Sequence, residues 1–188
     1  MNKIKRILIT GANKGIGFAT VEKLLKAYDE TFILLGTRDL RKGKEAINSL
    51  ILKQREWKDR LDLIEIDVEK DYSVKNAAEK VSQKFNEASQ PIYAILNNAG
   101  IGGTQQSFNK IFQVNTYGPK RVCDAFIPLL NSSKGRVVNV TSASGPIYLA
   151  TCSKKIKEIL TNRDVTWTQI ENFLSDHLKS NLESEQIS

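Results

Sequence analysis

Three glycines close to the start of the chain have a spacing that suits the binding of phosphate groups. They occupy positions 11, 15 and 17 in the sequence TGANKGIG, residues 10–17. Glycines let such a turn close tightly and let its backbone N–H groups approach a pyrophosphate, and the amino terminus of a following helix attracts an anion. An ordinary tight turn explains a lone glycine-rich segment equally well, but a strand pattern before this one and a helix pattern after it favour a dinucleotide site. The contacts predicted from this segment are those of Gly11, Asn13, Lys14, Gly15, Ile16 and Gly17.

Two basic residues stand where they could select the nucleotide. Lys14 lies in the glycine-rich segment, and Arg38 follows the second strand pattern, TFILLG. A cation there suits the 2′-phosphate of NADP, because arginine can fork onto phosphate oxygens. Asp39 complicates the assignment, since an acid about twenty residues after the glycines suits the ribose of NAD, and two exposed basic residues without a ligand are a further alternative. We predict that the cofactor is NADP(H).

The elements that must position these residues alternate between strand and helix. Apolar, β-branched runs predict strands at residues 3–10, 31–36, 61–67, 92–97 and 136–141. Helical spacing falls between them, at residues 16–28, 41–57, 72–86 and 110–130. The alternation predicts an α/β fold in which a doubly wound parallel sheet carries helices on both faces. Beyond Gly145 we expect a short helix at residues 153–160 and another that begins at Thr166, where Gln169 completes a capping box.

Four motifs, in the same order along the chain, resemble those of the short-chain dehydrogenase/reductase family. The first is the glycine-rich segment, and the second is Asn97-Asn98-Ala99-Gly100 at the end of the fourth strand pattern. The third is FQVNTYG, which carries Asn115, and the fourth is GRVVNVTS, which ends at Ser142. Within the family, NKGIG at residues 13–17 and the helical stretch after Ser142 are most similar to the carbonyl reductase branch, with its menthol- and salutaridine-type reductases.

The resemblance implies a Rossmann-like sheet in the strand order 3-2-1-4-5, with the family's sixth and seventh strands missing from this chain. Residues 1–188 would form a single NADP-binding domain in which residues 146–188 are the helical insertion of this branch. The fifth strand would then have an uncovered apolar edge, through which copies of an otherwise monomeric protein could associate. Further cofactor contacts implied by the family are those of Asp67, Val68, Asn98, Ala99 and Gly100.

The implied activity is NADPH-dependent reduction of ketones, aldehydes or quinones, and in this family it needs a tyrosine, a lysine, a serine and an asparagine. The tyrosine donates a proton, and a lysine four residues later lowers the pKa of that tyrosine. Ser142 matches the serine, although a plain turn serine is the alternative, and Asn115 matches the asparagine. No tyrosine of the chain has a lysine four residues after it.

The remaining tyrosines do not fill the gap. Tyr148 follows Ser142 too closely for the family's spacing and is expected in a loop, while Tyr117 is expected to pack beside its helix. We therefore expect a carbonyl reductase whose catalytic set is incomplete; the alternative is a non-catalytic NADP(H)-binding protein that acts as a sensor or partner.

Charge, hydropathy and the cysteine and histidine positions argue against a nucleic-acid-binding, membrane, secreted or metal-binding protein. The net charge of +7 is spread along the chain without a block of like charge, so no nucleic-acid partner is predicted. No apolar run approaches the roughly 18–20 residues of a membrane span, and no secretory signal is visible, so a cytoplasmic protein is expected. Cys123, Cys152 and His177 lack the spacing of metal ligands, and His177 is expected to flank a packing stripe instead.

Overall fold

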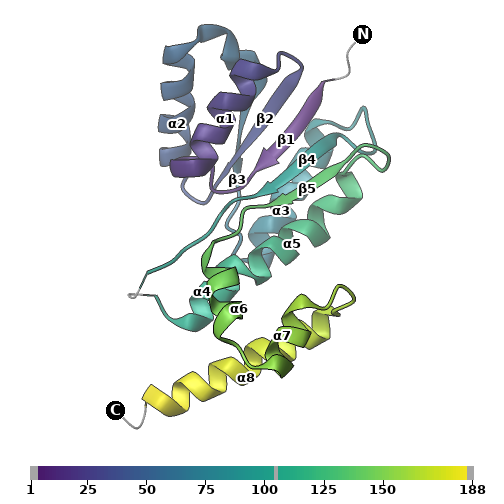
Figure 1. The fold of residues 1–188 in the computed structure, drawn as a ribbon. Helices are drawn as coiled ribbons and strands as arrows, with labels where there is room; N and C mark the ends of the chain where they lie inside the picture. Colours follow the sequence, from purple (N-terminus) through teal and green to yellow (C-terminus); the bar gives the residue numbers. More distant parts are fainter. Residues whose placement is uncertain (1–3, 104–105, 186–188) are drawn as a thin grey trace.

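The computed structural model describes residues 4–103 and 106–185. Its centre is a parallel five-stranded sheet in the order β3-β2-β1-β4-β5 (Figure 1), which confirms the predicted architecture. The strands are β1 (Lys5–Ile9), β2 (Thr31–Thr37), β3 (Leu61–Glu65), β4 (Ile92–Asn97) and β5 (Arg136–Asn139).

Helices cover both faces of the sheet because successive strand residues, which point to opposite sides, are apolar on both. Ile7 and Ile9 of β1 pack in one apolar cluster with α1 (Gly15–Ala27) and α2 (Leu40–Lys53). Leu8, between them, belongs to a second cluster with α3 (Asp71–Lys84) and α5 (Tyr117–Phe126). The two layers hold the sheet rigid, so that the loops at its carboxyl edge have a fixed platform.

The helix predicted at residues 110–130 is wrong as a single element. The structure has α4 (Phe108–Asn115), a break at Thr116, then α5 and a short 3-10 turn at Ile127–Leu129. Pro119 explains the break, because it has no N–H to donate to the carbonyl of Asn115 four residues earlier. Asn115 therefore ends a helix instead of lying inside one.

Two other boundaries differ from the prediction. The helix expected at residues 41–57 ends at Lys53, and a 3-10 segment, Arg55–Arg60, follows and buries Trp57. Tyr148 lies in a helix, α6 (Ser144–Thr151), and not in a loop.

The two helices expected after Gly145 are present as α7 (Lys154–Thr161) and α8 (Trp167–Glu185). The capping box before α8 is confirmed: Thr166 N–H donates to Gln169 Oε1 at 2.8 Å, and Gln169 N–H donates to Thr166 Oγ1 at 3.3 Å. These helices lie beyond the sheet, next to α4 (Figure 1). The side chain of His177 lies outside the described residues.

β5 forms one edge of the sheet and is poorly covered. Its residues are all exposed; Val137 and Val138 keep 39% and 46% of their surface accessible, and Val140 just beyond the strand keeps 44%. Among the described strands, β5 pairs only with β4. None of the described helices is long and apolar enough to cross a membrane.

Candidate active site

A cleft of about 520 Å³ opens at the carboxyl ends of the strands, above β1 and β4. It is lined by every residue predicted to contact the cofactor except Gly17. Three apolar side chains that the sequence analysis did not select complete the lining, namely Ile66, Ile101 and Val114. The cleft has the size, place and glycine content that a dinucleotide requires at the edge of such a sheet.

Gly15 keeps one wall of this cleft open. Its φ of +58° lies in the left-handed region, where other residues are strained. A Cβ atom built on it would meet nothing within 4 Å, so the space beside this backbone is free. The amino terminus of α1 begins here, and its unpaired N–H groups suit an anion.

Gly17 contributes by close packing and not by lining the cleft. A Cβ atom there would lie 2.5 Å from Asn98 Nδ2 and 2.7 Å from the carbonyl oxygen of Gly11. Because Gly17 has no side chain, α1 can pack directly against the Gly11 loop and Asn98, which is a known role of glycine in such segments.

Thr10 ties the glycine-rich segment to the segment after β4. Its buried hydroxyl accepts hydrogen bonds from the N–H groups of Asn98 and Ala99, both at 3.0 Å. Asn98 returns the contact, because its Nδ2 donates to the carbonyl oxygens of Thr10 and Gly11 at 2.9 and 3.1 Å. This network fixes the two loops that face each other across the cleft.

Replacing Thr10 with valine is expected to loosen both loops. The substitution keeps the shape of the side chain but leaves Ala99 N–H without its acceptor, at about 1–3 kcal/mol for an unsatisfied group. Asn98 N–H keeps its second acceptor, the carbonyl oxygen of Leu96 at 3.1 Å. The Tm should fall by about 2–12 °C, measured by circular dichroism. Thr10→Ser, which keeps the hydroxyl and loses only the methyl group, is the control and should lower the Tm less; a Tm of Thr10→Val equal to that of the unchanged chain would contradict the role of the hydroxyl.

The two cations predicted to select the nucleotide line the cleft and form no ion pair with the described residues. Lys14 and Arg38 are both exposed and both line it. Neither takes part in an ion pair among the described residues. Two free cations at one cleft mouth create a positive field that attracts a phosphate group.

Asp39, the residue that complicated the choice of cofactor, has another task. It caps α2: its Oδ1 accepts a hydrogen bond from Lys42 N–H at 3.1 Å, and its Oδ2 lies 3.6 Å from Lys42 Nζ. These contacts, with the backbone N–H of Lys42 as the main cause, lower the pKa of the Asp39 carboxyl. Asp39 does not line the cleft.

The Asp67 carboxylate already has partners within its own turn. Its Oδ1 accepts a hydrogen bond from Glu69 N–H at 3.2 Å, and its Oδ2 pairs with Lys70 Nζ at 3.6 Å. The pKa of Lys70 is raised, mainly by Tyr72 and next by Asp67. Asp67 and Val68 line one side of the cleft, and these contacts hold the Asp67 side chain in place there.

Asn115 does not line the cleft but braces it. Its Oδ1 accepts a hydrogen bond from Ile101 N–H at 2.9 Å, and its Nδ2 donates to Ile101 O at 2.8 Å. Both atoms of the amide are therefore used to hold the chain just after Gly100. Because Pro119 has no N–H, the backbone carbonyl of Asn115 receives no helical hydrogen bond from the residue four positions later.

Ser142 lies at the end of β5 in an exposed position outside the cleft lining. Its hydroxyl contacts the Ser144 hydroxyl at 3.1 Å and accepts a hydrogen bond from Ser144 N–H at 3.1 Å. This is the geometry of a turn serine that starts a helix. The structure thus brings the nucleotide residues together but leaves Ser142 apart from them.

The tyrosines stay separate from this set. The pKa of Tyr148 is raised, mainly by desolvation and further by Cys152, whereas an activated proton donor needs a lowered one. The Tyr117 ring packs edge-to-face on Trp167, with centroids 5.4 Å apart, as its predicted packing role required. Among the described residues there is no group of three or more potential metal ligands.

Comparisons with known proteins show the family to which the chain belongs. Residues 5–154 match the family model described as short chain dehydrogenase. The chain is 34% identical over 167 residues to the (+)-neomenthol dehydrogenase of Arabidopsis thaliana, covering 74% of this chain and 54% of that one. It spans about half the length of the curated relatives it matches.

Solved structures extend the likeness to the helical segment. The menthone neomenthol reductase from Mentha piperita superposes with a TM-score of 0.85 at 25% identity, over 99% of this chain and 76% of that one. The NADPH-bound carbonyl reductase from chicken fatty liver superposes with a TM-score of 0.65 at 25% identity, over 82% and 67%. With its glycine-rich cleft, its sheet order and its match over residues 5–154, the chain belongs to the short-chain dehydrogenase family.

Proposed function

We propose that the cleft binds NADP(H) in preference to NAD(H). The observation that carries the proposal is the contrast between neighbours at the end of β2: Arg38 is free and lines the cleft, whereas Asp39 caps α2. An acid would have to be free to bind the ribose hydroxyls, and a cation to bind the 2′-phosphate. The NADPH-bound relative from chicken fatty liver supports the same cofactor.

Each end of the cofactor has residues that would hold it. Lys14 and Arg38 would bind the 2′-phosphate, Asp67 and Val68 would border the adenine, and the backbone near Gly15 would bind the pyrophosphate. A bound reduced nicotinamide supplies a hydride. The protein's part is to exclude water, to orient the ring and to place a carbonyl compound beside it.

We further propose that the whole protein reduces a carbonyl compound, by analogy with relatives named for menthone and for carbonyl groups. Ser142 would orient the carbonyl oxygen of the substrate by a hydrogen bond, and the backbone carbonyl of Asn115, which Pro119 cannot bond, would hold a water. For Ser142 to act, its hydroxyl must give up its hydrogen bond to the Ser144 hydroxyl and bond to the substrate instead. The present chain offers no tyrosine–lysine pair for the proton, so we propose that it binds the cofactor without turning over.

A turnover assay tests the catalytic half of the proposal. The purified chain is mixed with NADPH and menthone, and the absorbance at 340 nm is followed. Loss of a positioned proton donor lowers a rate by about 10²–10⁴-fold, so no decay above the protein-free rate is expected. Decay that scales with protein concentration would show that a residue of this chain, with Tyr148 the first candidate, supplies the proton.

A second candidate function is cofactor sensing without catalysis. The sequence favours it, because no tyrosine of the chain has a lysine four residues later, and the pKa of Tyr148 is raised by desolvation and by Cys152. A cytoplasmic location, a monomeric state and association through β5 stay predictions for either function.

A further inference from the structure

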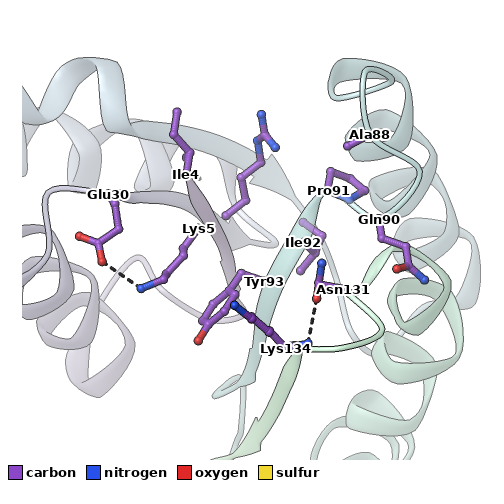
Figure 2. Close-up of a pocket in the computed structure, with 11 residues that line it drawn as sticks. Ile4, Lys5, Glu30, Ala88, Gln90, Pro91, Ile92, Tyr93, Asn131 and Lys134 are labelled. Carbon is purple, nitrogen blue, oxygen red and sulfur yellow. Dashed lines mark hydrogen bonds and ion pairs between the residues drawn. The ribbon is translucent and has the colours of Figure 1, made fainter. Parts of the chain in front are cut away.

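A second cavity lies at the opposite edge of the sheet from the cofactor cleft. It has a volume of about 290 Å³ and opens between the amino ends of β1 and β4 (Figure 2). The loop that leads into β5 closes its third side. Its lining comes from Ile4, Lys5, Arg6, Glu30, Ala88, Gln90, Pro91, Ile92, Tyr93, Asn131 and Lys134.

Two side-chain amide oxygens of this cavity already accept hydrogen bonds from the protein. Asn131 Oδ1 accepts from the N–H groups of Ser133 and Lys134 at 3.3 and 2.8 Å, and from the Ser133 hydroxyl at 3.1 Å. Gln90 Oε1 accepts from Ser132 N–H at 3.0 Å. The amide nitrogens of Asn131 and Gln90 have no acceptor among the described residues, so both side chains keep N–H groups that a ligand could use.

The charges of the cavity favour an anion as well. Glu30, its one acidic residue, is held by Lys5 at 2.9 Å, and Arg6 pairs with Glu87 at 2.7 Å and lies 4.2 Å from the centre of the Phe85 ring. Lys134 takes part in no ion pair among the described residues. Two of the three cations of the lining are thus neutralised by an acid, and Lys134 remains as the unpaired positive charge.

The rest of the lining is apolar. Pro91 and Ile92 are buried, and the half-buried Tyr93 ring, with Lys5 Nζ 5.5 Å from its centroid, forms a flat wall beside them (Figure 2). Apolar walls with a few convergent donors are what small organic ligands require. We infer that this cavity is a second ligand site, which binds a small carboxylate with an aromatic body through Lys134, Asn131 and Gln90.

Calorimetric titration of the full chain with benzoate tests this site, with benzamide as the neutral probe of the same shape. Benzoate should bind, and benzamide should bind at least about tenfold more weakly, because a charge-assisted hydrogen bond is lost. Lys134→Met should weaken benzoate about tenfold. Lys44→Met removes the same charge from exposed α2, outside both cavities, and should change nothing.

The same titration separates this site from the cofactor cleft. Arg38→Ala should leave benzoate binding unchanged, and amide resonances of Gln90 and Tyr93 should shift while those of Gly15 should not. Equal binding of benzoate and benzamide, unchanged affinity in Lys134→Met, or loss of binding in Arg38→Ala would each overturn the inference. Because both Lys134 and Lys44 are exposed, neither variant is expected to disturb folding, and matching Tm values verify this.

Discussion

Replacing Arg38 with alanine is expected to weaken NADPH binding by about 10–100-fold while changing NADH binding by less than about twofold. The guanidinium is free, exposed and part of the cleft lining, so its one task in the site is to meet the phosphate that distinguishes the two cofactors. Charge-assisted hydrogen bonds of this kind contribute about 1.5–3 kcal/mol each. Fluorescence titration of both reduced cofactors measures the two affinities.

Arg41→Ala is the matched control for that experiment. Arg41 is exposed on α2, three residues further on, and pairs with Glu45 at 2.7 Å; it does not line the cleft. Its removal takes away the same net charge and should leave both affinities unchanged. If Arg38→Ala weakens NADPH and NADH equally, Arg38 does not read the phosphate, and the preference for NADP(H) has no basis at this residue.

Replacing Gly15 with alanine is expected to remove NADPH binding with only a modest loss of stability. The left-handed backbone costs an alanine about 1–2 kcal/mol, but its methyl group meets no protein atom within 4 Å. The methyl group instead occupies the open side of the loop, where the pyrophosphate must approach. We expect an affinity loss of about 100-fold and a Tm fall of about 2–8 °C.

Alanine substitutions at two other glycines serve as comparisons for Gly15→Ala. Gly102→Ala adds a methyl group in equally open space at an ordinary φ, outside the cleft, and should change neither quantity. Gly17→Ala drives a methyl group to within 2.5 Å of Asn98 Nδ2 and should lower the Tm more than Gly15→Ala does. A Gly15→Ala variant that binds NADPH normally would mean that the pyrophosphate does not pass this loop.

The sheet was predictable because its signal is local and strong. Each buried strand is a short apolar run, and successive residues such as Leu8 and Ile9 pack in different clusters. The glycine-rich segment was predictable for a related reason, since its residue types and its place between strand and helix both lie within a few positions of one another.

One error, the helix at residues 110–130, and one open question, the role of Asp39, had signals in the sequence that were weak beside the periodicity. The apolar spacing of residues 110–130 continues through Pro119, yet the missing N–H of that proline breaks the helix at Thr116. Asp39 immediately precedes a helix, which is a capping position, and Lys42 three residues later receives the cap. Capping explains why this acid does not face the cleft.

Other features could not have been predicted, because they depend on contacts between distant segments. The bonds between Thr10 and Asn98 join residues 88 positions apart, and Asn115 clamps a backbone 14 positions away. The motifs selected Asn98 and Asn115 as functional residues, but only the fold reveals that they brace the cleft. Lys134 is likewise left without an ion pair because the nearby acids Glu30 and Glu87 pair with Lys5 and Arg6, which only the fold reveals.

The most direct test is a fluorescence titration of the purified 188-residue chain with NADPH and, in parallel, with NADH. The free cations Lys14 and Arg38 predict saturable binding of both, with NADPH at least about tenfold tighter. Equal affinities would contradict the role of these cations, and an absence of saturable binding would contradict the cleft itself as the cofactor site.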